Sequence, residues 1–237
     1  MNPTDDTPGL AVVLGGTGGI GAALADGLRQ QGHTVLAIGR RTAPALDYAD
    51  DSTVAAVAQF VAAELDRTGL PLRRLVVATG ILHEGVVQPE RSWTHLDAAA
   101  LQRLFLVNTI GPALVMRHCL PLLPRKGRSV AAFISARVGS IGDNRLGGWY
   151  GYRASKAALN QLVHTAAIEL ARRCPQALCV ALHPGTVDTA LSQPFAKTGL
   201  EVRPPTVAAQ ELLQVMDTLP EGSNGGFFDH HGTTVPW

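Results

Sequence analysis

The sequence has little charge and few aromatic residues. Charged residues make up 16 % of the 237 residues and aromatic residues 5 %, whereas hydrophobic residues reach 46 %. A chain this apolar and weakly charged is expected to fold rather than to stay disordered. The formal net charge is only +1, which offers no excess of positive charge to a nucleic acid or an anionic membrane. We therefore expect a globular protein that binds neither partner.

Cysteine is also scarce, and Cys119, Cys174 and Cys179 lack the spacing of a metal site. This sparse, odd-numbered set is typical of reduced thiols and predicts a cytoplasmic protein without a bound metal. The polar start MNPTDDTPG differs from a secretory signal, and no uninterrupted apolar run reaches the roughly 18 residues that a membrane helix needs. We interpret residues 1–9 as a flexible N-terminal tail and expect residues 10–237 to form one domain.

Short apolar segments alternate with helical patterns along the chain. Strands are predicted at 10–15, 34–39, 73–80, 128–135, 177–185 and 225–230. Helices are predicted at 19–32, 51–68, with Asp51 and Ser52 as candidate caps, 96–120, interrupted at Gly111–Pro112, 152–173 and 206–217. Near-continuous apolar strands are typical of burial on both faces, and strand–helix alternation indicates a parallel sheet. The predicted fold class is α/β, a single Rossmann-type doubly wound parallel sheet with helices on both faces.

A glycine-rich turn, LGGTGGIG, joins the first predicted strand to the first helix. This arrangement suits a phosphate group, because the helix N-terminus offers free N–H groups and a partial positive charge. The glycines fit G-x-G-x-x-G, G-x-x-x-G-x-G and G-x-x-G-x-x-G equally well. A turn that serves only packing, and a methyltransferase with another adenine-containing cofactor, stay open from this loop alone. The predicted dinucleotide contacts here are Gly15, Thr17, Gly18, Gly19, Ile20 and Gly21.

Two arginines, Arg40 and Arg41, follow the second predicted strand. Folds that bind an unphosphorylated ribose usually carry an acid about 20 residues beyond the glycines. An arginine pair instead suits a 2′-phosphate through charge-assisted hydrogen bonds. We therefore predict NADP(H) in preference to NAD(H), which stays possible; two solvated surface arginines are the alternative. Asp47 is either a contact of the adenine amino group or an ordinary loop acid.

Tyr152 and Lys156 lie four residues apart and share one face of the predicted helix. A nearby ammonium favours the phenolate and lowers the pKa of the tyrosine, which would make Tyr152 a general acid or base near neutral pH. Tyr150 faces elsewhere and is expected to shape the pocket. Many surface helices carry a Tyr-x-x-x-Lys pair, but together with the glycine turn the pair is a specific signal.

From GGTGGIG to its last strand, the sequence resembles the short-chain dehydrogenases/reductases. The segments SARVGSIGDNRLGGWYGYRASKAALNQL and ALHPGTVDTAL are most similar to the C-factor-like and sniffer-like carbonyl reductase groups. The resemblance implies hydride transfer between a nicotinamide and a carbonyl or alcohol. It implies a catalytic set of Asn108, a serine, Tyr152 and Lys156. It adds cofactor contacts from Ala78, Thr79, Gly80, Pro184, Gly185, Val187 and Thr189.

The sequence departs from the pattern of that family at three places. Leu14 replaces the threonine before the glycines, and VATG replaces Asn-Asn-Ala-Gly. The catalytic serine is expected three residues before Gly139, where Ala136 stands. Ser135 is our candidate serine, with Ser140 as the alternative; Ser135 needs the strand end to bend, because successive strand side chains point to opposite faces. Without such a donor to the oxyanion, the barrier rises by roughly 3 kcal/mol.

The sequence therefore predicts an NADPH-preferring oxidoreductase that interconverts a small carbonyl compound and its alcohol, with Tyr152 as general acid/base. The helices 96–120 and 152–173 favour a homo-oligomer, a dimer or a tetramer, and residues 190–204 are expected to form a substrate lid. Two alternatives stay open. One is a dinucleotide-binding signalling or redox-sensing protein with little turnover, motivated by Ala136. The other, a sugar-nucleotide epimerase, is disfavoured because fewer than 50 residues follow PGTVDT.

Overall fold

The computed structural model of the chain describes residues 7–85, 87–193 and 202–237, so most of the predicted tail lies outside the described residues. Within them, six strands form one sheet in the order β2-β1-β3-β4-β5-β8, and every neighbouring pair is parallel. The strands are β1 (Leu10–Leu14), β2 (Thr34–Ile38), β3 (Leu72–Val77), β4 (Ser129–Ile134), β5 (Ala177–His183) and β8 (Phe227–Asp229). A separate short pair consists of β6 (Thr186–Val187) and β7 (Val202–Arg203). The predicted doubly wound parallel sheet is confirmed.

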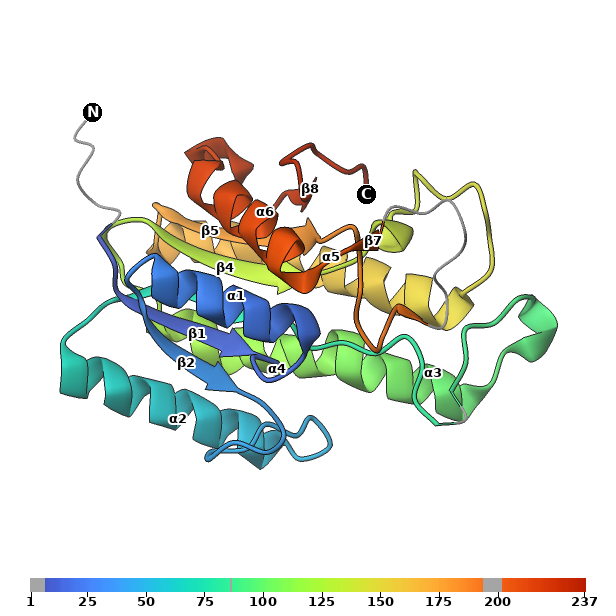
Figure 1. Cartoon of the computed structure of the whole chain (residues 1–237), viewed down its shortest axis with the longest axis horizontal. Coiled ribbons are helices and arrows are strands. Elements are labelled where there is room, and N and C mark those ends of the chain that lie inside the picture. Colours follow the sequence, from blue (N-terminus) through green and yellow to red (C-terminus); the bar gives the residue numbers. More distant parts are fainter. Residues whose placement is uncertain (1–6, 86, 194–201) are drawn as a thin grey trace.

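Helices cover both faces of this sheet (Figure 1). On one face lie α1 (Gly19–Gln30) and α6 (Pro205–Thr218). On the other face lie α2 (Asp51–Thr68), α4 (Gly111–Cys119) and α5 (Tyr150–Arg173). Successive residues of β1 enter the two cores in alternation: Leu10, Val12 and Leu14 pack with the second set of helices, and Ala11 and Val13 with the first. The absence of polar residues from β1 follows from this burial on both faces.

The strand order reverses beside β1, because β2 pairs with one edge of β1 and β3 with the other. In sheets of this kind, ligands bind in the crevice at the carboxyl ends of the strands where the order reverses. Gly15 follows β1 there with a φ of +82°, and a Cβ on it would lie 2.9 Å from the carbonyl of Ala78, which follows β3. The two strand ends therefore meet backbone to backbone at the crevice.

The predicted helix 96–120 is divided within the fold. It consists of α3 (Ala98–Phe105), a wide π-helical turn (Leu106–Ile110) and α4. The interruption lies one turn before the predicted Gly111–Pro112, because a proline lacks the N–H that would bond the carbonyl four residues earlier, at Asn108. Wide turns of this kind are frequent at functional sites. The turn places Asn108 in the buried interior.

The N-terminus of α2 also differs from the prediction. The cap is Asp50, whose carboxylate accepts a hydrogen bond of 2.9 Å from the backbone N–H of Ser52. Asp51 and Ser52 already belong to the helix. Three acidic or hydroxyl residues in a row all suit a helix start, and only the backbone conformation decides which of them is the cap.

By length and composition alone, one stretch within residues 7–85, 87–193 and 202–237 would suit a membrane-crossing helix. It is Ala98–Leu122, which comprises α3, the wide turn, α4 and a short helical turn at Leu120–Leu122. Core helices of non-membrane proteins pass the same test.

Candidate active site

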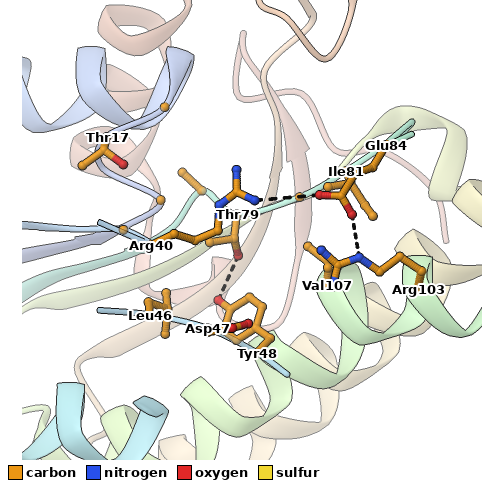
Figure 2. Close-up of a pocket in the computed structure, with 15 residues that line it drawn as sticks. Thr17, Arg40, Leu46, Asp47, Tyr48, Thr79, Ile81, Glu84, Arg103 and Val107 are labelled. Atoms are coloured by element: carbon orange, nitrogen blue, oxygen red, sulfur yellow. Dashed lines mark hydrogen bonds and ion pairs between the residues drawn. The ribbon is translucent and has the colours of Figure 1, made fainter. Parts of the chain in front are cut away.

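A cavity of about 220 Å³ opens at the carboxyl ends of β1, β2 and β3 (Figure 2). The predicted cofactor residues that line it are Gly15, Thr17, Gly18, Arg40, Asp47, Ala78, Thr79 and Gly80. A second cavity of about 320 Å³ shares Ala78, Thr79 and Gly80 with the first. Its lining includes the predicted residues Ile20, Ser135, Tyr152, Lys156, Pro184, Gly185, Val187 and Thr189. The fold thus brings most of the predicted cofactor and catalytic residues to one groove.

Neighbouring atoms leave no room for a side chain at Gly19 and Gly21 of the turn. A Cβ on Gly19 would lie 2.6 Å from the Cγ2 of Thr189, and a Cβ on Gly21 would lie 2.1 Å from the carbonyl oxygen of Gly15. A Cβ on Gly18 would have room, since its nearest neighbouring atom is 3.6 Å away. Among the three possible spacings, the geometry selects G-x-x-x-G-x-G. Because α1 starts here with no side-chain cap, its first N–H groups suit a phosphate.

The two predicted arginines differ in position. Arg40 lines the first cavity, whereas Arg41 is absent from the described lining of both cavities. Arg40 Nη1 lies 3.8 Å from Glu84 Oε1, and Arg103 Nε donates a hydrogen bond of 2.6 Å to Glu84 Oε2. Figure 2 shows this chain of charges running from the end of β2 to α3. No local sequence pattern indicated Glu84 or Arg103, because only folding brings them to the groove.

Tyr48 is a further groove residue that the sequence analysis missed. It is buried, and its hydroxyl lies 2.9 Å from the Oγ1 of Thr79. A Cβ on Gly111 would lie 2.2 Å from the Tyr48 ring, so the ring packs directly on the start of α4. Tyr48 therefore fixes the loop that carries Asp47 and Leu46 against the groove. In the sequence, only the position of Tyr48 directly after Asp47 indicated that it lies near the groove.

Tyr152 and Lys156 lie on the first turns of α5 and are both buried. Lys156 Nζ donates a hydrogen bond of 2.9 Å to the carbonyl of Ile134 and lies 5.9 Å from the centre of the Tyr152 ring. Burial lowers the pKa of Lys156 to about 8, because the amine loses its hydration. Burial also raises the pKa of Tyr152 above its ordinary value. The expectation of a lowered tyrosine pKa is therefore wrong for this structure: burial of the hydroxyl raises the pKa, and the phenol is neutral at neutral pH.

Asn108 is held by three hydrogen bonds of its side-chain amide. Its Nδ2 donates to the carbonyl of Ile81 at 2.9 Å and to Ser155 Oγ at 3.1 Å, and its Oδ1 accepts from the Ile81 N–H at 2.9 Å. Ser155 Oγ in turn donates to the Tyr152 carbonyl at 2.9 Å. A Cβ on Gly80 would lie 3.4 Å from Asn108 Oδ1. Asn108 thus ties the segment after β3 to the helix that carries Tyr152, although it is absent from the described linings.

Neither candidate serine directs a free hydroxyl at the second cavity. Ser135 lines it, but its hydroxyl donates a hydrogen bond of 2.6 Å to Asn160 Oδ1. Ser140 is absent from the described lining, and its hydroxyl accepts from a backbone N–H in the next turn. Ser135 continues the sheet through its N–H, which bonds the Leu182 carbonyl at 2.7 Å, so the strand end stays regular. Ala136 therefore stands at the cavity where the serine was expected.

The start of α5 depends on Glu90, which the sequence analysis also missed. The preceding residue, Trp149, has a φ of 54° and supplies no side-chain cap. Both carboxylate oxygens of the buried Glu90 accept from the Gly151 N–H, at 3.3 and 3.2 Å. The Glu90 carbonyl accepts from the Trp149 N–H at 2.6 Å. Glu90 therefore fixes the start of the helix that carries Tyr152. The Trp149 ring meets the Tyr152 ring edge-on, with centroids 6.3 Å apart.

The rest of the second cavity is mostly apolar, with Leu82, Val138, Trp149 and Leu191 in its lining. His183, at the end of β5, also lines it, and burial together with nearby positive groups lowers the pKa of His183 to about 4. Of the predicted lid, residues 194–201 lie outside the described residues.

The described residues offer no group of three or more His, Cys, Asp or Glu side chains that could hold a metal ion. Cys119, Cys174 and Cys179 are free and buried.

Known proteins resemble this chain in sequence. The sequence model of the family described as short chain dehydrogenase matches residues 9–199. The C-signal of Myxococcus xanthus is 37 % identical over 142 residues, which cover 60 % of this chain and 81 % of that protein. The 1-hydroxy-2-glutathionyl-2-methyl-3-butene dehydrogenase of Rhodococcus sp. (strain AD45) is 30 % identical over 237 residues, which cover 95 % and 98 % of the two chains.

Solved structures share the fold. The NADPH-bound carbonyl reductase from chicken fatty liver superposes with a TM-score of 0.80 at 23 % identity and covers 97 % of this chain and 99 % of its own. The carbonyl reductase Sniffer of D. melanogaster superposes with a TM-score of 0.77 at 22 % identity and covers 98 % and 100 %.

Proposed function

The chain belongs to the short-chain dehydrogenase family, and we propose that it is an NADPH-preferring reductase of a small carbonyl compound with Tyr152 as the proton donor. Membership of this family makes it an NAD(P)-dependent oxidoreductase and removes the methyltransferase alternative. One observation carries the finer proposal. A single groove has Arg40 at one end and a buried Tyr152–Lys156 pair at the other.

The chemistry of the groove fits a nicotinamide dinucleotide, which supplies the hydride when bound. The turn at residues 15–21 and the uncapped start of α1 suit the pyrophosphate. Arg40 suits the 2′-phosphate, and Asp47 suits the adenine side of the groove. The segment 184–189 and Ile20 line the second cavity, beside Tyr152, and suit the nicotinamide.

The proton chemistry follows from burial. Because its pKa is raised, Tyr152 keeps its proton at neutral pH and is suited to donate it to a carbonyl oxygen. With a pKa of about 8, Lys156 is mostly an ammonium at neutral pH, so it stabilises the phenolate that forms. It is also suited to hold ribose hydroxyls. The carbonyl of Asn108, which Pro112 cannot bond for lack of an N–H, is suited to hold a relay water.

The substrate proposed is a small, mainly apolar carbonyl compound. The apolar lining of the second cavity supports this class, and so do the names of two similar proteins, which are carbonyl reductases. Ala136 offers no hydrogen bond to the substrate oxygen, so Tyr152 carries more of the stabilisation of that oxygen than it would beside a serine.

The test is oxidation of NADPH and of NADH with a panel of aldehydes, ketones and quinones. We expect turnover, with a higher kcat/KM for NADPH. Tight binding of NADPH with no turnover on any compound would instead favour a dinucleotide-binding signalling or redox-sensing protein, the alternative that Ala136 motivates.

We further propose a homo-oligomer in the cytoplasm. Ile110, before α4, and Ile168, on α5, are 47 % and 52 % exposed, which supports pairing of these helices between copies of the chain. The free, buried cysteines support a reducing compartment. Light scattering on the purified protein is expected to give a dimer or tetramer, and a monomer at micromolar concentration would contradict the proposal.

A further inference from the structure

The groove proposed for the cofactor contains a carboxylate that phosphate binding does not need. Glu84 lines the first cavity on the side opposite Arg40 (Figure 2). Its backbone is fixed by a reciprocal pair of hydrogen bonds with Val87, of 3.1 and 2.9 Å. A negative charge beside a phosphate site repels the ligand unless cations offset it. The surroundings of Glu84 therefore decide how it acts on the cofactor.

Glu84 joins two arginines from different elements. Arg103, on α3, donates to Oε2 at 2.6 Å, and Arg40, after β2, lies 3.8 Å from Oε1. The Arg40 side chain is 81 % exposed, compared with 35 % for Arg103. Arg103 therefore holds Glu84 through a short hydrogen bond. The exposed Arg40 makes a longer ion pair with Glu84 and is able to bind another anion in its place.

Glu84 is ionised at neutral pH. The hydrogen bond from Arg103 and the attraction of Arg103 and Arg40 hold the pKa of Glu84 below its ordinary range. Two cations, Arg40 and Arg103, and two anions, Asp47 and Glu84, line the cavity. The charges balance, so an incoming phosphate finds no surplus cation and has to compete for Arg40.

We propose that Glu84 limits the affinity for the 2′-phosphate by occupying Arg40 when that phosphate is absent. The inference rests on the proposed NADPH preference and adds to it a residue that sets how strongly the preference is expressed. Arg103 is a positioning residue, because it holds Glu84 toward Arg40. NADH does not compete for Arg40, so its affinity is nearly independent of Glu84.

The test is the substitution Glu84→Gln, which removes the charge and keeps the size of the side chain. We expect the Kd of NADPH to fall about two- to fivefold, the size typical of an exposed charge pair, while the Kd of NADH changes little. Fluorescence titration of the full chain measures both constants. Glu64→Gln is the matched control, since Glu64 pairs with Arg67 at 2.7 Å on α2, outside the described lining of the groove; it should change neither constant.

A second variant separates the possible causes. In an Arg40→Ala background, Glu84→Gln should no longer lower the Kd of NADPH by most of the amount seen with Arg40 present. The Glu84 carboxylate and the 2′-phosphate compete for Arg40, which this background lacks. An unchanged or weaker affinity for NADPH in Glu84→Gln would overturn the inference, as would equal tightening of NADPH and NADH. If Arg40→Ala alone weakens both cofactors equally, the NADPH preference itself fails. If Arg40→Ala is selective and Glu84→Gln has no effect, only the role of Glu84 fails.

Discussion

At the scale of single residues, burial decides which groups in the groove carry a proton. It lowers the pKa of Lys156 to about 8 and raises that of Tyr152. The spacing of the two residues indicated the pair, but desolvation depends on the segments packed over it, which spacing does not encode. At neutral pH the pair is an ammonium beside a neutral phenol, the protonation state that the proposed proton donation requires.

Ala136→Ser tests what the missing hydroxyl costs. Ala136 lines the second cavity, so a serine there would offer a hydrogen bond to the substrate oxygen. Removing such a donor typically costs about 10²–10³ in kcat. We expect kcat for a carbonyl substrate to rise by about tenfold, less than the full effect because the site is not shaped around the added group.

Ser135→Ala is the control for that variant. The Ser135 hydroxyl is bonded to Asn160, so its loss should change kcat by less than about threefold. A fall of a hundredfold or more in Ser135→Ala would contradict this reading and restore Ser135 as the oxygen donor. Steady-state kinetics with one ketone substrate measures both variants.

Arg40 and Arg41 are adjacent in sequence, but only Arg40 is in the described lining of the cavity. A charge-assisted hydrogen bond contributes about 1.5–3 kcal/mol. We therefore expect Arg40→Ala to weaken NADPH about 10- to 100-fold and to leave NADH nearly unchanged. Arg41→Ala should affect neither, and calorimetric titration measures all four constants. A larger effect from Arg41→Ala would show that Arg41 binds the phosphate.

At the scale of elements, α5, the helix that carries Tyr152 and Lys156, depends on a loop far away in the sequence. Glu90 and Gly151 are separated by 61 residues, which is why no local motif revealed the contact. The glycine turn, by contrast, was predictable from the sequence, because its strand, turn and helix follow one another along the chain. The wide turn at Leu106–Ile110 lies between these cases: its cause, Pro112, was visible, but its position one turn earlier was not.

Glu90→Ala should lower both stability and kcat. The variant leaves the Gly151 N–H without its acceptor, which costs about 1–3 kcal/mol in a buried place. The start of α5 carries Tyr152, so kcat should fall while the KM for NADPH changes little. Glu90→Gln keeps an acceptor and should recover most of both. Urea unfolding and steady-state kinetics measure the two effects, and an unchanged kcat in a destabilised Glu90→Ala would limit Glu90 to a structural role.

At the scale of the whole molecule, the apolar runs in the sequence predicted the strands of the sheet. They did not predict which charged side chains meet in the groove. Glu84 lies in a loop, Arg103 on a helix and His183 at the end of a strand. The side chains around each of them come from other parts of the chain. Runs and turns are local in sequence, whereas ion pairs and desolvation are pairwise and long-range. The fold was therefore more predictable than the electrostatics of the site.

His183 gives the molecule a built-in sensitivity to acid. His230, Arg137 and Arg203 add to burial in lowering the pKa of His183 to about 4, and Asp229 opposes them. In the unfolded chain, His183 is protonated as the pH falls through about 6.5. In the folded chain, it stays neutral until the pH reaches about 4. Stability should fall as the pH drops through this window, by up to about 3 kcal/mol for this residue.

His183→Asn should remove that part of the acid sensitivity. Urea unfolding at pH 7 and at about pH 4.5 gives the loss of free energy of unfolding for each protein. The loss should be smaller by about 2–3 kcal/mol in the variant than in the unchanged chain. If the loss of free energy of unfolding is equal in both proteins, His183 takes up no more proton in the unfolded chain than in the folded chain between these pH values. That result would contradict the prediction.

The most direct test of the account is single-turnover hydride transfer from bound NADPH in Tyr152→Phe, with the Kd of NADPH measured in parallel. A positioned general acid contributes about 10²–10⁴ to the rate, so the variant should lose that much while it binds NADPH within about threefold of the unchanged chain. A rate within tenfold of the unchanged protein would show that another group supplies the proton, and the proposed role of Tyr152 would be contradicted.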